Sequence, residues 1–587
     1  MCGILTVIRK SDKQFDISAC RRALSRLSWR GPDLCVSAVW QDRVFLGQTV
    51  LSLTGTIQNR KNTYTSSASG RYMLAFNGEI YNYRELARKF LQDRLTLTNV
   101  TTDTEVLATL HDVMPAEEIP ALLDGMYAYT VLDKAEETLY VVRDVQGEKS
   151  LYLYEDEGII VISSEISAIQ SLVPGLPINK QALRDYFRTR HFMLFSRTAF
   201  QGIRQILPGH VECFQLPTGP WKIAKQHKLS DLIDHERMEN NAARSIDDLT
   251  DELDALLIEA VKEMLPEEQS YAAVVSGGVD SSLLSHYLVA YGDPDLLVAV
   301  DHIGKDLISC DLSGFEKILG RPIEVLRINE TTYASEIVRC QETTCGPLHA
   351  HSFIPQSLQS AYAKSAGCRV IFGGEGGDEY FGGYDAYLSK IDPLSNYSPS
   401  QYLAHSMPEV DFIEDAPSIL QVELAQAWAD SQHAYASVVD SNQRERLAMM
   451  FGDAAYQLPA VGLRGSDLMS MMWSLEARSI FLRRPIITFA LNLPLQAKID
   501  PHANDQNMRT KVLLKRLFLR YYPASLLVKK QGFAGFPNES AFFLGSLDDY
   551  LAFDFLGIRR PKARGSYSKA TLWKLANIEY FLRNRFR

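Results

Sequence analysis

The chain has 587 residues, a length that favours about two to four domains over a single core. A hydrophobic content of 46% and a charged content of 22% are typical of globular proteins and exclude disordered or collagen-like chains. The net charge of -10 disfavours a general nucleic-acid binder, and without a bilayer-length apolar run or a secretory signal we expect a cytoplasmic protein that has neither nucleic-acid nor membrane partners.

Residues 1–210 are dense in short strand-like runs, which two helical patterns interrupt. The strand-like runs are residues 4–8, 44–46, 72–76, 139–142 and 159–162. The helical patterns are residues 83–91 and 104–113. These elements predict a layered, mixed α/β domain.

Residues 211–247 turn polar, with a proline- and glycine-containing run followed by many charged residues, and predict a linker. Beyond it, strand-like runs alternate with helical patterns, as a parallel sheet with crossover helices requires. These runs are residues 271–275, 296–300 and 369–372. We predict a second α/β domain over residues 248–587, mainly helical in its C-terminal part.

Cys2 has the most informative position of the eight cysteines. Removal of Met1 would leave its thiol beside a free α-amine, whose pKa of about 8 allows it to act as a base near neutral pH. A cysteine at this position also occurs by chance. Cys2 is therefore evidence for a catalytic nucleophile only together with the motifs that follow it.

Four segments of the first domain stand in a definite order. They are Met1-Cys2-Gly3-Ile4, Arg30-Gly31-Pro32-Asp33, Phe76-Asn77-Gly78-Glu79-Ile80-Tyr81-Asn82 and Thr102-Asp103-Thr104-Glu105. This set resembles the class II glutamine amidotransferase domain, an N-terminal-nucleophile fold built as an αββα sandwich. The resemblance implies that Cys2 attacks the side-chain amide of glutamine, while Asn77 and Gly78 supply the oxyanion hole.

Glutamine binding is implied for Asn77, Glu79 and Asp103, the last two at the α-amino group. Each motif also has a simpler structural interpretation, because Asn-Gly is a strong hairpin-turn signal and Asp103 could cap a helix. The joint occurrence of all four segments in this order favours the functional interpretation.

Val50 departs from the family pattern, which has an arginine there to hold the α-carboxylate of glutamine. Loss of a bidentate guanidinium weakens carboxylate binding unless another cation replaces it. Arg30, Arg60 and Lys61 are the candidates for that replacement.

Residues 276–282, Ser-Gly-Gly-Val-Asp-Ser-Ser, follow the strand-like run at 271–275 and precede a helical pattern. Glycines between a strand and a helix let backbone N–H groups converge on phosphate oxygens, and the helix dipole favours the negative charge. The segment resembles the PP-loop of ATP pyrophosphatases, although an ordinary turn is the simpler alternative. Its implied ATP and pyrophosphate ligands are Ser276, Gly277, Gly278, Asp280, Ser281 and Ser282, with Gly374 from a later loop.

Residues 373–379, Gly-Gly-Glu-Gly-Gly-Asp-Glu, form a second glycine-rich loop after a strand. Neighbouring carboxylates repel one another unless a cation joins them, so Mg²⁺ is expected in place of a merely solvated turn. The resemblance implies that Asp280 and Asp378 bind the metal. It also implies that Glu375 takes a proton from the incoming ammonia. Lys530 is implied to contact the phosphate or the developing intermediate.

Taken together, the two halves resemble the glutamine-dependent asparagine synthetase family over nearly the whole chain. The resemblance implies a glutamine-hydrolysing ligase that uses ATP and Mg²⁺ to adenylate a small carboxylate and then forms an amide, releasing AMP and pyrophosphate. Ammonia would be lost to solvent, so we expect an internal passage between the two sites. We also consider a homodimer. Residues 474–482 and 529–533 resemble family blocks of a helical subdomain.

Arg483 replaces an acidic residue of the family pattern, which leaves the acceptor open. Aspartate and a specialised carboxylate, such as a sugar acid or a natural-product precursor, are alternatives. A non-catalytic interaction or regulatory descendant is a second class. An RNA-modifying PP-loop enzyme is a third, and the acidic charge conflicts with it.

Overall fold

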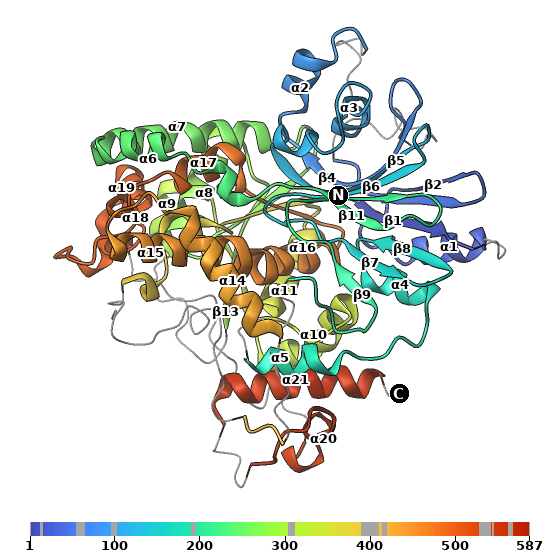
Figure 1. Cartoon of the computed structure of the whole chain (residues 1–587). Helices are drawn as coiled ribbons and strands as arrows, with labels where there is room; N and C mark the ends of the chain where they lie inside the picture. The colour runs from blue at the N-terminus through green and yellow to red at the C-terminus, as the bar shows by residue number, and fades with distance from the viewer. Residues whose placement is uncertain are drawn as a thin grey trace.

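The computed structural model describes two domains that lie side by side (Figure 1). It describes every residue except 1, 12–15, 54–64, 95–101, 189–194, 303–311, 389–409, 414–418, 528–541, 543–544, 562–566 and 586–587. Within the described residues, no helix is both long enough and apolar enough to cross a membrane.

The N-terminal domain consists of two facing antiparallel sheets. One sheet has the order β2-β3-β1-β8-β7-β9 and the other the order β11-β10-β6-β5-β4. Their strands are β1 (Cys2–Arg9), β2 (Leu34–Trp40), β3 (Val44–Val50), β4 (Tyr72–Ile80), β5 (Gly125–Asp133), β6 (Thr138–Arg143), β7 (Tyr152–Glu155), β8 (Ile159–Ser163), β9 (Ile203–Gln205), β10 (His210–Gln215) and β11 (Trp221–Gln226). Apolar side chains from both sheets, such as Ile4 and Leu46 on one and Ala128 and Val141 on the other, share one buried core.

Helices cover the outer faces of both sheets and complete the predicted αββα sandwich. They are α1 (Ile17–Ser25), α2 (Tyr83–Phe90), α3 (Asp103–Leu110) and α4 (Ile166–Leu172). The next helix, α5 (Lys180–Arg188), packs instead against α20 (Leu551–Leu556) and α21 (Lys569–Arg585) (Figure 1). Leu24 and Ile169 pack on the first sheet, whereas Leu86 and Leu107 pack on the second. The fold class is therefore the one that the sequence predicts for this half.

The first part of the expected linker, 211–247, is instead part of this domain. Strand β10 pairs with β6, and β11 pairs with β10, so residues 210–226 extend the second sheet. The polar run that suggested a linker contains the turn between β10 and β11, where the backbone N–H of Gly219 donates to the carbonyl of Gln215 at 2.8 Å. A hairpin with one solvated face has the same polar composition as a linker.

The C-terminal domain contains a parallel sheet of order β14-β13-β12-β15-β16. Its strands are β12 (Tyr271–Val274), β13 (Leu296–His302), β14 (Glu324–Ile328), β15 (Val370–Gly373) and β16 (Glu476–Ser479). The expectation that residues 474–482 belong to a helical subdomain is wrong for β16, which pairs with β15 and forms an edge of this sheet. A four-residue strand is too short to show a clear period in the sequence.

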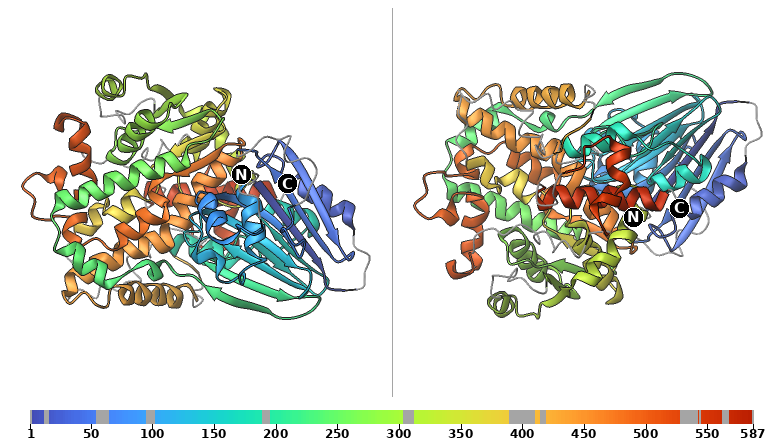
Figure 2. Two further views of the ribbon diagram at one scale, coloured as in Figure 1. Left: turned by 90° about the horizontal axis from the view of Figure 1, so that it is seen from above. Right: turned by 90° about the horizontal axis from the view of Figure 1, so that it is seen from below.

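Helices surround this sheet and form most of the remaining chain (Figure 2). They are α6 (His235–Ala242), α7 (Ile246–Met264), α8 (Val279–Tyr291), α9 (Leu312–Leu319), α10 (Glu330–Thr344), α11 (Phe353–Ser365), α12 (Gly377–Phe381), α14 (Ile419–Ala434), α15 (Ser441–Gly452), α16 (Arg464–Met471), α17 (Arg484–Leu491), α18 (Leu495–Lys498), α19 (Val512–Tyr521), α20 (Leu551–Leu556) and α21 (Lys569–Arg585). A π-helical segment, Asp453–Leu463, joins α15 to α16 and contains Pro459. Helix α21 returns to the N-terminal domain, where Phe581 packs against Phe200.

Candidate active site

Cys2 begins the central strand β1 and lies opposite Val50 of β3 in the sheet register. Its side chain is buried, and Nε2 of Gln48 lies 3.2 Å from Sγ. The backbone nitrogen of Cys2 donates to Oδ1 of Asn77 at 3.0 Å. Removal of Met1 would turn this nitrogen into an α-amine, so the strand start holds the thiol, its own base and Asn77 together.

Asn77 and Gly78 lie within β4 and pair with Ala128 and Tyr127 of β5, so the hairpin-turn alternative is wrong. In the described part of the chain, Nδ2 of Asn77 is buried and has no hydrogen-bond partner. A Cβ atom at position 78 would overlap the backbone of β5, which explains the glycine. The unused amide N–H of Asn77 is therefore a donor beside the thiol, as an oxyanion hole requires.

Glu79 and Asp103 are two buried carboxyls beyond Asn77. Burial and the charge of Asp103 raise the pKa of Glu79 to about 8, although Arg478 opposes this. Asp103 accepts from the backbone of Ile80 at 3.1 Å, which ties α3 to the end of β4. The cap of α3 is Thr102, whose side chain accepts from Glu105 N, so the cap interpretation of Asp103 is wrong. Two carboxyls in one buried site favour binding of a cation such as an α-ammonium group.

Arg30 does not have a free guanidinium for the α-carboxylate of glutamine. Its Nε donates to the carbonyl of Cys2 at 3.1 Å, while Nη1 binds Glu165 at 2.5 Å and Nη2 binds Asp467 at 2.9 Å. Arg30 thus positions the start of β1 and anchors it to the C-terminal domain. The other two candidates for the cation, Arg60 and Lys61, lie outside the described residues.

The predicted PP-loop lies between β12 and the start of α8. The hydroxyl groups of Ser276 and Ser281 lie 2.8 Å apart, and Ser281 also accepts from the backbone of Ser276 at 3.0 Å. Gly277 has a φ of +75°, and Gly278 occupies the N-cap of α8. Ser282 is buried in the first turn of this helix. The loop thus joins a left-handed turn to a helix N-terminus, an arrangement that suits an anion such as phosphate.

Asp280 of this loop and Asp378 of the acidic loop converge on Lys511. The ammonium of Lys511 forms ion pairs with both carboxylates, at 2.6 Å from Oδ1 of Asp378. Burial would lower the pKa of Lys511, but these two carboxylates hold it above its usual value. Two carboxylates that share one cation fit Mg²⁺, which typically takes one or two protein carboxylates and completes its shell with water and phosphate.

Gly374 and Glu375 follow β15 in the chain, but Gly374 lies against the PP-loop and Glu375 lies at the domain interface. A Cβ atom at Gly374 would lie 3.3 Å from Cβ of Asp280, so this glycine abuts the PP-loop. The half-buried side chain of Glu375, whose pKa is raised by desolvation, lines a small cavity with Lys149 and Arg478 at the domain interface. Lys530 lies outside the described residues. The structure therefore groups the loop residues together and places Glu375 toward the glutaminase half.

Arg478 of β16 reaches the glutamine site from the other domain. Its Nη2 lies 3.9 Å from Oε2 of Glu79, and its Nε donates to Glu476 at 2.7 Å. The same side chain lines the small cavity beside Glu375. A single arginine thus contacts one candidate site and borders the other.

Arg483 forms its described contacts across the interface between the two domains. Its guanidinium is buried and binds Asp124 of the N-terminal domain at 2.5 and 2.8 Å, and it also pairs with Glu263 of α7. The ring of Tyr81 lies 4.8 Å from its guanidinium carbon. These contacts place Arg483 at the domain interface, and its bearing on the acceptor stays a prediction.

Sequence reasoning assigned no role to Gln48, Lys511 or Arg478. The strand register could have placed Gln48 beside Cys2, because β1 and β3 are adjacent and antiparallel. Lys511 and Arg478 gave no signal, since Lys511 lies far along the chain from Asp280 and Asp378, and Arg478 lies far along the chain from Glu79. Only the tertiary fold brings them into these sites.

Comparison with known proteins agrees with this division of the chain. Residues 1–220 match the glutamine amidotransferase domain, and residues 252–577 match asparagine synthase. A probable glutamine-hydrolysing asparagine synthetase of Acanthamoeba polyphaga mimivirus is 27% identical, over 65% of this chain and 68% of that protein. A putative glutamine-hydrolysing asparagine synthetase of Mycobacterium bovis is 25% identical, over 92% of this chain and 87% of that protein. Amidase chry2 of Gibberella zeae is 25% identical, over 67% of this chain and 61% of that protein.

The second match alone covers more than half of the 587 residues, and the first covers the domain that carries Cys2. Both fit the geometry, in which a domain with a buried thiol at the start of its central strand packs against a domain whose glycine-rich loop precedes a helix N-terminus. The chain therefore belongs to the asparagine synthase family and is a glutamine-dependent, asparagine-synthetase-like ligase.

Proposed function

We propose that the chain adenylates a small carboxylate with ATP and converts the adenylate into an amide with ammonia taken from glutamine. The observation that carries this proposal is the position of Arg478. It lies 3.9 Å from Glu79 of the glutamine site and borders the cavity of Glu375. Two sites that share an interfacial side chain suit transfer of a small nucleophile between them.

In the glutaminase half, the thiol of Cys2 attacks the side-chain carbonyl carbon of glutamine after its proton passes to the α-amine. The unused N–H of Asn77 donates to the oxyanion, and Glu79 with Asp103 holds the α-ammonium group. The α-ammonium group of Cys2 gives the thiol proton to the amide nitrogen, which leaves as ammonia, and water then hydrolyses the thioester to release glutamate and the free thiol. Gln48 orients the sulfur through its 3.2 Å contact.

In the synthetase half, the acceptor carboxylate attacks the α-phosphorus of ATP and pyrophosphate leaves. The PP-loop from Ser276 to Ser282 and Gly374 would hold the phosphates. Asp280 and Asp378 would hold Mg²⁺, which when bound neutralises phosphate charge. Ammonia then attacks the acyl carbon, AMP leaves, and Glu375 accepts the proton that the nitrogen loses.

The acceptor is proposed as aspartate, with a specialised carboxylate as the second candidate. Aspartate rests on the relatives named as asparagine synthetases, and the relative named amidase chry2 is compatible with the second candidate. The position of Arg483 at the domain interface removes one reason to reject aspartate. Several expectations stay predictions. They are the phosphate role of Lys530, a cytoplasmic location, a homodimer, a synthetase domain at 248–587 and a glutaminase domain at 1–210, which the pairing of β10 and β11 extends to residue 226.

The decisive experiment incubates the full chain, with processed Cys2, with ATP, Mg²⁺ and glutamine, and supplies one candidate acid at a time. Pyrophosphate, AMP and glutamate are measured. Release of all three that depends on one acid identifies the acceptor. No pyrophosphate with aspartate, sugar acids or natural-product precursors would contradict the proposal and favour an interaction protein, and release that depends on RNA would indicate a modifying enzyme.

A further inference from the structure

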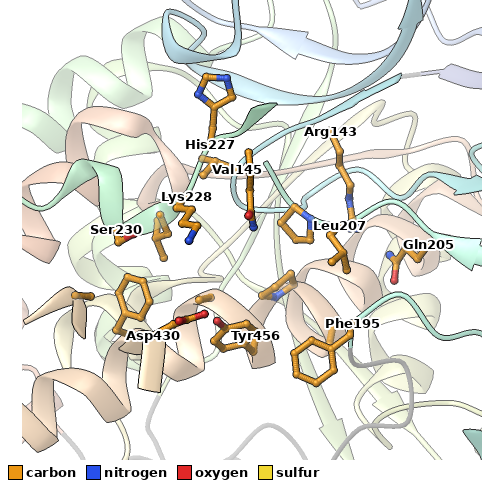
Figure 3. Close-up of a pocket in the computed structure, with 18 of the residues that line it drawn as sticks. Arg143, Val145, Phe195, Gln205, Leu207, His227, Lys228, Ser230, Asp430 and Tyr456 are labelled. Atoms are coloured by element: carbon orange, nitrogen blue, oxygen red, sulfur yellow. The ribbon is translucent and has the colours of Figure 1, made fainter. Parts of the chain in front are cut away.

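A separate cavity lies between the two domains (Figure 3), and neither Cys2 nor the PP-loop contributes to its lining. Its volume is about 230 Å³. Arg143, Pro208 and Lys228 line it from the N-terminal domain and the segment that follows β11, and Asp430 and Tyr456 line it from the helical layer. A concave space with apolar and polar walls at a domain interface is the usual setting of a small-molecule site.

Opposite charges face each other across this cavity. The side chains of Lys228 and Asp430 point into it from opposite sides (Figure 3). Both residues are exposed, and Asp430 accepts a hydrogen bond from Nε2 of Gln426 at 2.9 Å, but neither has an ion pair among the residues that the structure describes. Burial and the charge of Asp430 raise the pKa of Tyr456 to about 12, so its hydroxyl stays a neutral donor beside that carboxylate. A ligand that carries one positive and one negative group fits between these two side chains.

Aromatic and aliphatic side chains form the rest of the wall. The rings of Phe195 and Tyr456 lie 5.9 Å apart, and Phe451 and Leu207 line the same space. These groups provide an apolar surface beside the charged pair. The apolar wall therefore selects a ligand with a hydrophobic body of modest size.

One wall of the cavity is the π-helical segment Asp453–Leu463. Pro459 within it has no N–H to donate, which disrupts the regular helical hydrogen bonding. Stretches of π-helix are rare and often lie at functional sites. The π-helical wall is therefore evidence for a functional cavity that does not depend on the charged side chains.

The opposite wall is the turn that follows β6. Arg143 donates to the carbonyls of Lys149 and Gly147, at 2.7 Å each, and to that of Ile206 at 2.6 Å. Gly147 has a φ of +69° and is packed so closely between Pro208, Arg143 and Pro459 that a Cβ atom would lie 3.2 Å from Cβ of Pro459. Arg143 and Val145 line the cavity, so a ligand there would contact the start of this turn.

The far side of the same turn borders the small cavity of Glu375. Glu148 and Lys149 line that cavity, and the backbone N–H groups of both donate to Asp144 at 2.9 and 3.1 Å. Gln146 receives a hydrogen bond from Tyr380, at the end of the acidic loop. The turn thus has the larger cavity on one side and the proposed ammonia route on the other.

We propose that the larger cavity binds an α-amino acid with an apolar side chain and that the bound ligand orders the turn from Arg143 to Lys149. Lys228 binds the ligand's carboxylate, Asp430 with Tyr456 binds its ammonium group, and the side chain packs on Phe195 and Phe451. This site is distinct from the glutamine site at Cys2.

Calorimetric titration of the full chain with phenylalanine, 3-phenylpropionate and 2-phenylethylamine tests the assignment, and it requires no turnover. Phenylalanine carries both charged groups, and each analogue lacks one, so we expect phenylalanine to bind at least about tenfold more tightly than either. Lys228→Gln is expected to weaken the binding of phenylalanine and phenylpropionate by about tenfold. Asp430→Asn is expected to weaken the binding of phenylalanine and phenylethylamine by a similar factor. Lys222→Gln and Glu239→Gln, at exposed positions outside the cavity, are matched controls.

Two further variants separate this cavity from other sites. Ala455→Phe fills the cavity and is expected to abolish binding of all three probes, whereas Glu79→Gln alters the glutamine site and is expected to leave phenylalanine binding unchanged. Hydrogen exchange at Glu148 and Lys149 is expected to slow when phenylalanine binds. No heat at about 10 mM phenylalanine, or an affinity unchanged by both Lys228→Gln and Asp430→Asn, would overturn the site, and unchanged exchange would overturn the ordering of the turn.

Discussion

Asn77 carries two hydrogen-bonding groups with different tasks. Its Oδ1 accepts from the nitrogen of Cys2 at 3.0 Å, whereas its buried Nδ2 is the proposed oxyanion donor. Asn77→Asp keeps the acceptor and removes the donor. We expect kcat for glutamine hydrolysis to fall by about 10²- to 10³-fold, with a smaller change in KM, because this bond forms in the transition state. Release of ammonia at saturating glutamine measures the effect.

Amide formation from added ammonium is the control for Asn77→Asp, because that reaction bypasses the thiol. We expect its rate to stay within about twofold of the wild type. An equal loss of the ammonium-dependent and glutamine-dependent rates would mean that the substitution disturbs the fold instead of the oxyanion hole.

The acid–base state of Glu79 links pH to glutamine binding. Burial and the charge of Asp103 raise its pKa to about 8, so below that pH its neutral form dominates and cannot pair with an α-ammonium group. We expect KM for glutamine to fall as pH rises from about 6 to 8, as the carboxylate forms. Glu79→Gln should raise KM at pH 8 and flatten this dependence. Steady-state assays across pH test this, and a KM that responds to pH equally in both proteins would contradict it.

The residues that could be predicted from the sequence are those that stand in short motifs of consecutive residues. Cys2, Asn77 and the PP-loop serines stand in short motifs, and the backbone around each is set by its own strand or turn. The partners of these groups come from distant segments, as Arg478 does beside Glu79. A cation that meets a carboxylate only through domain packing leaves no pattern in the sequence, so such pairs could not be predicted.

At the scale of elements, two loops that follow parallel strands share Lys511, the residue before α19. Lys511→Met leaves the carboxylates of Asp280 and Asp378 facing each other without that cation. We expect the free energy of unfolding to fall by about 2 kcal/mol, less than for a fully buried pair because Asp378 is 22% exposed. Added Mg²⁺ should recover part of this loss, since it would neutralise the same two groups. Denaturant unfolding with and without Mg²⁺ measures both effects.

Lys498→Met is the matched control for this experiment. Lys498 is also buried, and burial lowers its pKa to about 7, but it donates to the carbonyl of Tyr380 instead of joining two carboxylates. The loss of stability in Lys498→Met should not be recovered by added Mg²⁺. A similar Mg²⁺ response in both variants would show that the metal stabilises the protein elsewhere.

Strands and helices with a strong period were predictable, and short or solvated ones were not. The central strands β12, β13 and β15 have apolar runs because helices cover both faces of a parallel sheet. Strand β11 is largely exposed and polar, so its composition resembled a linker, and β16 has only four residues. The pairing of these strands depends on neighbours that no local pattern specifies.

On the scale of the whole molecule, buried ion pairs join the two domains. Arg30 and Lys149 of the N-terminal domain both bind Asp467, and Arg483 of the C-terminal domain binds Asp124. Guanidinium groups with several donors fix orientation as well as distance, so these pairs align the two candidate sites. Domain alignment matters here because ammonia has to reach the second site before it escapes.

Arg483→Gln tests whether this alignment serves transfer or acceptor choice. The substitution leaves the buried carboxylate of Asp124 without its guanidinium, and we expect a loss of about 3 kcal/mol of stability and a higher ratio of glutamate to amide formed. Arg483→Lys keeps the charge without the planar fork and should give an intermediate ratio. The ranking of acceptor acids should stay the same in both, because Arg483 contacts Asp124 and Glu263. If the ranking of acceptor acids changes while the ratio of glutamate to amide stays the same, Arg483 would instead act in the choice of acceptor.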